Sequence, residues 1–303
     1  MKLEKECTEL STELDSTEYV LNCFLANKKL EGCAKDTLDQ YRWTANKLFA
    51  MMGKGYQYIT KDDVKYYLAV RSRHVGKNTL VNEKRNLSSF FTWLHDEGLI
   101  AQNPVKPIKG IRGEDVEFKV FSVEEEVAIR DVQASPRDKA IIAFLLSAGV
   151  RVGEIAKMER NNVNLTDGTV TFRGEKSRMG KYRTVFLDAR AKKYLSEYLL
   201  TRDDNNPALF VTERKYNGQP KRMRNQAFED VTRKICESAG IYGKGTVHTF
   251  RRTCATRLHE SGCPDQVIQQ LLGHADVSTT TKHYIAKNVK KARTLWEQYA
   301  MVA

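Results

Sequence analysis

The sequence lacks the marks of a secreted or membrane protein. None of the apolar runs in its 303 residues approaches the ~20 residues that span a bilayer, and the first residues, MKLEKECTEL, have no apolar signal-peptide core. The six cysteines are scattered and form no C-x-x-C pair, which argues against a disulfide framework or a zinc ribbon. We therefore expect a cytoplasmic protein with reduced thiols and no membrane contact.

The chain also lacks internal repeats, low-complexity tracts and any Asp, Glu and His cluster with the spacing of a divalent-metal site. Its hydrophobic content of 41% and charged content of 29% are ordinary for a globular protein and exclude a largely disordered chain. The length favours two domains. From these features we expect a two-domain protein that uses neither a metal nor another cofactor.

Positive charge is in excess, because 50 Lys and Arg residues stand against 38 Asp and Glu residues, a formal net charge of +12. Such an excess favours a polyanionic partner such as nucleic acid, although solvated lysines alone also account for it. The sign reverses in residues 1–15, where five acidic residues accompany two lysines. We expect this segment to be a flexible acidic N-terminus, too short and too acidic for a separate DNA-binding domain.

Residues 16–107 predict a bundle of short helices. An early helix is expected near Tyr19, and apolar residues recur at helical spacing from Asp36 onwards. Thr60 begins a capping-box sequence, and Asn78 is suited to cap a further helix. This bundle leaves basic residues at its polar edges, which are candidates for DNA contact: Arg71, Arg73, Lys77, Lys84 and Arg85.

A linker is expected at residues 108–120, because Pro104, Pro107, Gly110 and Gly113 interrupt any periodic pattern just before and within it. Beyond it, residues 121–303 have a mixed pattern. A capping sequence at Ser122 opens a helix, two strands near 169–172 and 184–187 flank a basic loop, and several helices follow. The expected fold class is therefore mainly α with a small β-sheet.

Four separated segments carry side chains suited to binding or attacking a phosphate. Arg151 follows an apolar helix, and the loop GEKSRMGKYR carries several cations. His248 and Arg251 lie three residues apart, on one face of a predicted helix, and Tyr284 follows a Ser/Thr run. Each alone has a simpler explanation: a solvated arginine, a polar turn, a histidine bound to a backbone carbonyl and a tyrosine in a core.

Taken together and in this order, these segments resemble the tyrosine recombinases of the phage integrase family. HTFRRTCAT and LLGHADVSTT are the most diagnostic stretches, and the resemblance covers the whole chain. It implies a helical N-terminal core-binding (SAM-like) domain, a basic linker and a mixed α/β catalytic domain. It also implies that the C-terminal segment forms a tail helix, residues 287–303.

The resemblance also assigns roles to residues. Arg151 and Arg251 would clamp the non-bridging oxygens of the scissile phosphate, and Glu154 would support the site without touching DNA. His248 matches a histidine that acts in acid/base catalysis and phosphate binding. His274 matches a second histidine, which hydrogen-bonds the phosphate. These residues supply positive charge where a phosphodiester gathers negative charge during attack, which fits a reaction without a metal.

The remaining roles are a nucleophile and a general acid. Tyr284 matches the nucleophile, although it lies one residue farther from His274 than is usual in the family; Tyr299 is a weaker candidate. Lys176 matches the general acid that protonates the leaving 5′ oxygen, and Lys181 is the alternative because the loop length leaves the alignment open. Further expected DNA contacts are Arg178, Lys181 and Arg252.

The implied function is site-specific DNA recombination through a 3′-phosphotyrosyl intermediate and a Holliday junction, without metal or ATP, in the integration or excision of a mobile element. The implied partners are double-stranded DNA, an accessory DNA-bending or directionality protein, and further copies of the chain in a homo-tetramer joined by tail exchange. The alternative for the tail is packing on its own domain. The alternatives for the function are a DNA-binding regulator with an inactive recombinase fold and a type IB topoisomerase-like activity; a metal-dependent nuclease is disfavoured.

Overall fold

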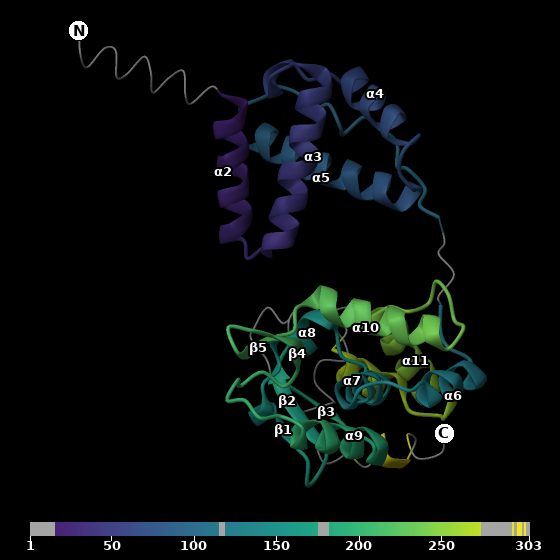
Figure 1. Ribbon diagram of the computed structural model, residues 1–303. Coiled ribbons are helices and arrows are strands. Elements are labelled where there is room, and N and C mark those ends of the chain that lie inside the picture. The colour runs from purple at the N-terminus through teal and green to yellow at the C-terminus, as the bar shows by residue number, and fades with distance from the viewer. Residues whose placement is uncertain are drawn as a thin grey trace. The chain divides into compact units, whose positions relative to one another are not determined.

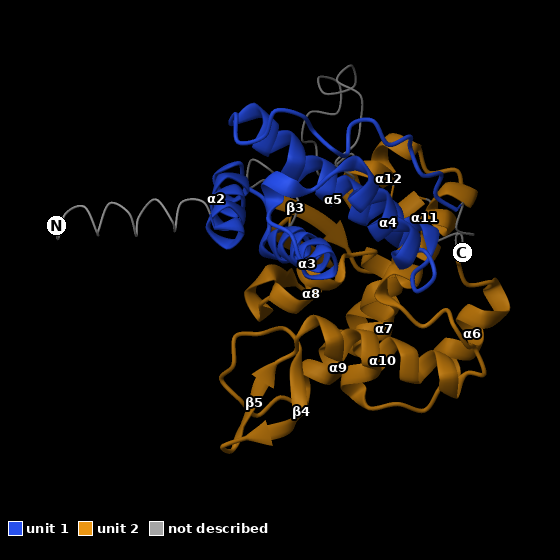
Figure 2. Ribbon diagram, turned by 90° about the horizontal axis from the view of Figure 1, so that it is seen from above, with its two compact units in different colours: residues 1–116 blue, residues 117–303 orange. Residues whose placement is uncertain are grey.

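The computed structural model describes residues 16–114, 119–174 and 182–273, together with residues 293, 296–298 and 300. The chain divides into two compact units, residues 1–116 and 117–303, which Figure 2 shows in different colours. The expected linker at 108–120 spans this division. Each unit has its own buried apolar core. The expected acidic N-terminus, residues 1–15, lies outside the described residues.

The first unit consists of helices, as the periodicity predicts. Phe24 lies at the centre of its core and meets Tyr41 and Phe90 edge to face, with ring centroids 5.2 Å apart in both pairs. The exposed faces of the helices carry most of the charged residues. In chain order the helices are α2 (Thr17–Leu30), α3 (Lys35–Met52), η1, a short 3₁₀ turn (Tyr56–Tyr58), α4 (Lys61–Arg71) and α5 (Lys77–Asp96) (Figure 1).

Two predicted helix starts in this unit have different outcomes. Thr60 forms the expected capping box with Asp63. The prediction for Asn78 is wrong, because α5 already begins at Lys77, after Gly76. The Asn78 side chain instead pairs with the backbone of Glu114, accepting from its N–H at 3.1 Å and donating to its carbonyl at 3.0 Å. It therefore ties the end of the first unit back onto α5.

The expected position of Arg71 on a polar edge is also wrong. Its side chain is buried, and its Nη2 lies 2.5 Å from Oε1 of Glu83, which is buried as well. The Tyr67 hydroxyl donates to the same carboxylate at 2.8 Å, and the guanidinium stacks over the ring of Trp43. Glu83 places a carboxylate on the buried face of α5, and Arg71, the last residue of α4, turns inwards to pair with it. Arg71 is thus not presented to DNA.

The other basic candidates of the first unit have different surroundings. Lys84 is half-buried and donates to the carbonyls of Ile108 and Lys109 at 2.8 and 3.1 Å, so it holds the end of this unit in place. Arg73, Lys77 and Arg85 are exposed, although Lys77 forms an ion pair with Glu114. Arg73 and Arg85 thus remain the most accessible cations of the predicted set.

The second unit is built around one buried helix. Ten of the thirteen residues of α7 are buried, and α7 packs against α9 and α11. A helix that is apolar on nearly every side belongs in the centre of a fold. Ser122 forms the capping box expected at the start of α6. The helices of this unit are α6 (Val123–Asp131), α7 (Pro136–Ala148), α8 (Val152–Lys157), α9 (Ala189–Leu200), α10 (Asn225–Ser238), α11 (Val247–Glu260) and α12 (Asp265–Leu272), with a 3₁₀ turn, η2 (Arg160–Asn162) (Figure 1).

The strands of the second unit form two small antiparallel sheets. One sheet has the order β1–β2–β3, with β1 at Val163–Asn164, β2 at Thr169–Arg173 and β3 at Tyr182–Phe186. Both strands expected around the basic loop are therefore present, and the loop, residues 175–181, lies outside the described residues. Together the two sheets and the many helices confirm the predicted fold class.

The second sheet, β4 (Val211–Tyr216) paired with β5 (Gln219–Arg222), was not predicted. Asn217 and Gly218 join its strands with φ angles of 52° and 77°. Two successive residues with positive φ make a type I′ turn, for which Asn-Gly is the preferred sequence. The signal for this hairpin was therefore present in the dipeptide.

The C-terminal residues that the structure describes lie on their own unit. Trp296 is buried against Phe186, with ring centroids 5.6 Å apart, and Ala300 packs against the same apolar cluster. In the single chain the tail thus follows the alternative of packing on its own domain. No described helix combines the length and apolarity needed to cross a bilayer.

The buried pair of Arg71 and Glu83 predicts a specific pattern of stability. Arg71→Met removes the partner of a buried carboxylate and should lower the unfolding free energy of the first unit by about 3–5 kcal/mol. The triple variant Arg71→Met, Glu83→Leu, Tyr67→Phe removes both charges together with the hydroxyl that donates to Glu83, and it should lie within about 1 kcal/mol of the wild type. Urea unfolding, followed by tryptophan fluorescence, measures both; equal losses in the two variants would contradict this account.

Candidate active site

The end of α7 places the first candidate residue. Gly149 ends the helix with a φ of 56°, in the left-handed region that favours glycine. A Cβ on Gly149 would lie 2.7 Å from Cδ2 of Leu272, so the α7 end and the α12 end approach closely. Two residues later, Arg151 precedes the first turn of α8. The sharp turn therefore sets Arg151 beside the C-terminal end of α12.

Glu154 is a buried carboxylate held between two arginines. One oxygen, Oε2, accepts from the backbone N–H of Arg151 at 2.8 Å, and the other, Oε1, accepts from Nη1 of Arg151 at 3.2 Å. Nη2 of Arg183, from strand β3, also donates to Oε2. Because the Glu154 side chain is fully shielded from solvent, this carboxylate fixes the direction of both guanidinium groups.

The second candidate arginine, Arg251, comes from α11 and is 4% exposed. Its Nη1 donates to the carbonyl of Gly149 at 2.7 Å, and its Nη2 donates to the carbonyl of Leu272 at 2.6 Å. Nη2 of Arg151 donates to the carbonyl of Gly273 at 2.6 Å. The last carbonyls of a helix carry partial negative charge, which favours cations at the end of α12. Arg151 and Arg251 thus converge on one helix end.

This arrangement concentrates positive charge in a buried place. Burial, followed by the charges of Arg151 and Arg183, lowers the pKa of Arg251 to about 10. Burial also lowers the pKa of Arg183. Arg251 remains a cation at neutral pH, so three arginines face one carboxylate, Glu154, and the cluster has two positive charges in excess. Such a cluster is suited to an anion that carries more than one hydrogen-bond acceptor, as a phosphodiester does.

The other candidate residues divide into two groups. His248 lies on the first turn of α11, three residues before Arg251, but it is exposed where Arg251 is buried. Arg252 lies on the same helix and is half-buried. The structure therefore joins Arg151 to Glu154, gathers Arg251 at the same end of α12, and places His248 one helical turn from Arg251. The remaining candidates lie outside the described residues: Lys176, Arg178, Lys181, His274, Tyr284 and the competitor Tyr299.

Arg183 is a site residue that the sequence reasoning missed, although a signal for it existed. Successive strand residues point to opposite faces of a sheet, so Arg183 shares a face with Val185, which is buried. An arginine on the buried face of a strand requires a partner, and Glu154 provides it. Strand alternation around the basic loop was therefore the signal that could have drawn attention to Arg183.

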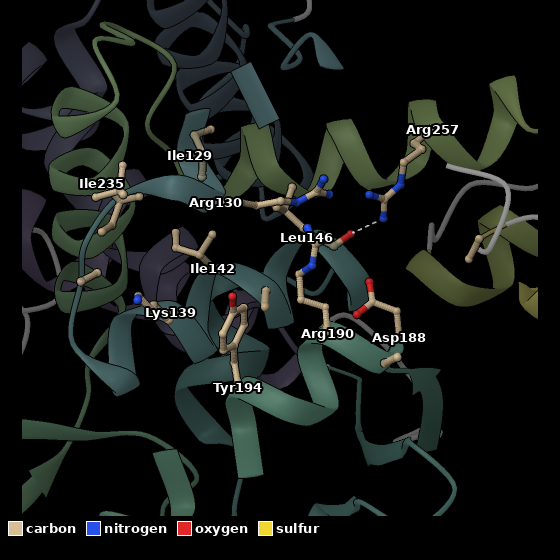
Figure 3. Close-up of a pocket in the computed structure, with 15 residues that line it drawn as sticks. Ile129, Arg130, Lys139, Ile142, Leu146, Asp188, Arg190, Tyr194, Ile235 and Arg257 are labelled. Carbon is tan, nitrogen blue, oxygen red and sulfur yellow. Dashed lines mark hydrogen bonds between the residues drawn. The ribbon is translucent and has the colours of Figure 1, made fainter. Parts of the chain in front are cut away.

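A separate pocket of about 260 Å³ lies among α6, α7, α9, α10 and α11, with Ala300 of the tail on its wall. Figure 3 shows Arg130, Arg190 and Arg257 around it, with Asp188 beside them. Arg257 donates to the carbonyl of Leu146 at 3.1 Å, so its guanidinium is held in place. The lining combines apolar side chains with cations and includes none of the predicted catalytic residues. Across the described ranges, no three His, Cys, Asp or Glu side chains gather in a way that could hold a metal ion.

Comparison with known proteins places the chain in a family. The model of the phage integrase family matches residues 121–291, more than half of the chain. The chain is 31% identical to the tyrosine recombinase XerD of Ralstonia nicotianae over 289 residues, which cover 89% of each protein. The chain belongs to the phage integrase family. It is accordingly an enzyme, a tyrosine recombinase, whose relatives act in site-specific DNA recombination.

Solved structures show the same fold. The recombinase is similar to lambda integrase (residues 75–356) bound to DNA, with a TM-score of 0.68, 18% identity, and coverage of 87% of this chain and 93% of that one. It is also similar to a lambda integrase tetramer bound to a Holliday junction, with a TM-score of 0.67, 18% identity, and coverage of 86% of this chain and 78% of that one. At these identities the likeness concerns the fold alone.

The close packing at the end of α12 generates a prediction for the recombinase. Gly273 has a φ of 64°, and a Cβ there would lie 2.7 Å from Nη1 and 3.2 Å from Cδ of Arg183. Gly273→Ala should therefore lower the unfolding free energy for two reasons. The left-handed backbone should cost about 1–2 kcal/mol, and the displacement of Arg183 should cost about 1–3 kcal/mol.

Gly240→Ala is the matched control, because Gly240 also has a positive φ, 75°, but a Cβ there meets nothing within 4 Å. Only the backbone cost should appear in this variant. Urea unfolding followed by circular dichroism compares the two, and a loss at Gly240 as large as that at Gly273 would contradict the packing argument.

Proposed function

We propose that this recombinase cleaves and rejoins duplex DNA through a 3′-phosphotyrosyl intermediate formed by Tyr284, without metal or ATP. The convergence of Arg151 and Arg251 around buried Glu154, at the end of the helix that leads to His274, is the observation that carries the proposal. In this proposal residues 16–107 form the core DNA-binding domain, residues 108–120 the linker and residues 121–303 the catalytic domain.

The arginines meet the main obstacle of the reaction. A phosphodiester is already an anion, and it gathers further negative charge on its non-bridging oxygens when a nucleophile attacks. Half-buried Arg151 and buried Arg251 supply cations that are already oriented, so little reorganisation is needed when the phosphate enters. When the phosphate binds, the terminal N–H groups of Arg151 and Arg251 would turn from the carbonyls of Gly273 and Leu272 towards the phosphate oxygens, or bond to both. His248 and His274 would add donors to the same oxygens.

The covalent step follows from the remaining side chains. The hydroxyl oxygen of Tyr284 attacks the phosphorus, the bond from phosphorus to the 5′ oxygen breaks, and Lys176 gives a proton to that oxygen; Lys181 is the alternative donor. A tyrosine has an ordinary pKa near 10, so the cationic site favours loss of its proton, which His248 would accept as the base. The phosphotyrosyl bond keeps the energy of the phosphodiester. A 5′ hydroxyl of another strand can therefore attack it without ATP.

Strand exchange requires several active sites on two duplexes, which we propose are assembled as a homo-tetramer on a Holliday junction. A lambda integrase of the same fold has been solved in that state. The tail of this chain offers a means of assembly. Trp296 and Ala300 pack against the second unit of their own chain, and every other copy presents the same surfaces. Exchange of the tail between neighbours would fill the same surfaces in a cyclic order.

DNA contact by the first unit would use its exposed cations. Arg73 and Arg85 are accessible and suited to phosphates, and their contribution should depend on salt. In the second unit the basic loop and Arg252 would follow the backbone near the cleavage point. We infer a role in the integration or excision of a mobile element, assisted by an accessory DNA-bending or directionality protein.

A covalent trapping experiment tests the proposed chemistry. Genomic DNA bound by the protein is first sequenced to recover its recognition site, which is then built into a nicked suicide duplex. In the presence of EDTA, the wild type should form a denaturant-stable protein–DNA adduct, and Tyr284→Phe should form none, because the phenyl ring has no oxygen to attack phosphorus.

Tyr299→Phe is the matched control and should form the adduct at the wild-type rate. An adduct that persists in Tyr284→Phe and disappears in Tyr299→Phe would assign the nucleophile to Tyr299. DNA binding by the wild type without any adduct would refute the proposed activity and favour a DNA-binding regulator.

A further inference from the structure

Arg183 occupies a position where a charged side chain is unusual. It stands directly opposite Phe172 in the pairing of β2 with β3, on the face of the sheet that Val185 shares. Its side chain is only 9% exposed, and its guanidinium lies over the Phe172 ring, 4.8 Å from the ring centroid. Taking a cation out of water is costly, so the contacts of this guanidinium must compensate for its burial.

These contacts join three elements of the second unit. Nη2 of Arg183 donates to the carboxylate of Glu154 on α8, and Nη1 donates to the carbonyl of Leu272, the last residue of α12. The planar guanidinium offers a rigid fork of donors, so one side chain makes both contacts at once. A lysine has a single nitrogen on a flexible stem and does not reproduce this fork. Arg183 thus links β3, α8 and α12.

Both contacts lead to residues of the proposed reaction. Glu154 receives the backbone N–H and Nη1 of Arg151, so the orientation of its carboxylate sets the direction of the Arg151 guanidinium. Leu272 also accepts from Arg251, and the next residue, Gly273, lies so close to Arg183 that a Cβ would meet it. The path of the chain towards His274 therefore starts from a point that Arg183 holds.

We propose that Arg183 is a positioning residue for DNA strand cleavage, which acts through Glu154 on Arg151 and through Leu272 on the end of α12. This inference rests on the proposed function. In this proposal Arg183 orients the phosphate-binding groups and does not itself bind the phosphate, because its guanidinium joins the carboxylate of Glu154 to the carbonyl of Leu272 and lies over the ring of Phe172. Oε2 of the buried Glu154 accepts two hydrogen bonds, one from the backbone N–H of Arg151 and one from Arg183. Without Arg183 this oxygen would keep only the bond from Arg151.

The test compares Arg183→Lys and Arg183→Met with Arg173→Met, a control that removes an exposed arginine from the neighbouring strand β2. The rate of adduct formation on the suicide duplex is measured in a single turnover with saturating protein, beside DNA affinity and melting temperature. Arg183→Lys should be slower by about tenfold and Arg183→Met by on the order of 100-fold, with affinity unchanged. Arg173→Met should react at nearly the wild-type rate.

A second substrate separates positioning from a general loss of structure. When a methyl group replaces one non-bridging oxygen of the scissile phosphate, the phosphate loses its charge and depends less on a well-oriented Arg151. The defect of Arg183→Lys should therefore shrink on this neutral duplex. An equal defect on both duplexes, or a wild-type rate for Arg183→Lys on the charged one, would overturn the proposal.

The remaining outcomes are equally distinct. Failure of both Arg183 variants to fold would make Arg183 a folding residue and overturn its positioning role. Absence of any adduct from the wild type would refute the proposed function itself, whereas a normal wild-type adduct with fast Arg183 variants refutes only this inference.

Discussion

The burial of Glu154 is the constraint on which the rest of the candidate site depends. A carboxylate without access to water is tolerated only when its oxygens are occupied by strong donors. Arg151 supplies two of these donors and Arg183 the third, so one acidic residue determines where α8 begins and how β3 packs. The arrangement of the proposed phosphate-binding groups is therefore a consequence of satisfying a buried charge.

The end of α12 is the second half of this arrangement. Its last carbonyls accept from Arg151, Arg183 and Arg251, which brings together groups from three distant parts of the chain. Burying cations beside one another is unfavourable: burial, followed by the charges of Arg151 and Arg183, lowers the pKa of Arg251. The carbonyls and Glu154 offset this cost, and in the proposed function a bound phosphate would offset it further. On that proposal, stability and activity rely on the same small set of contacts.

Local patterns predicted most of the architecture. Helical periodicity, the capping boxes at Thr60 and Ser122 and the strands flanking the basic loop were sufficient for the fold class. Motif order pointed to Arg151, Glu154 and Arg251; the structure pairs the first two and places Arg251 at the same helix end as Arg151. The errors concern long-range partners. Nothing near Arg71 in the sequence shows that Glu83 will bury it, and the pairing of Asn78 with Glu114 joins residues far apart in the chain.

In the proposed function, Arg151 acts above all on the charge of the scissile phosphate. The most direct measurement is the cleavage rate of Arg151→Ala on the charged duplex and on one whose scissile phosphate carries a neutral methylphosphonate. Arg183 still neutralises Glu154 in this variant, so the fold should survive. We predict a severe loss of cleavage on the charged duplex and a largely restored rate, relative to the wild type, on the neutral one. An equal loss on both duplexes would contradict the account.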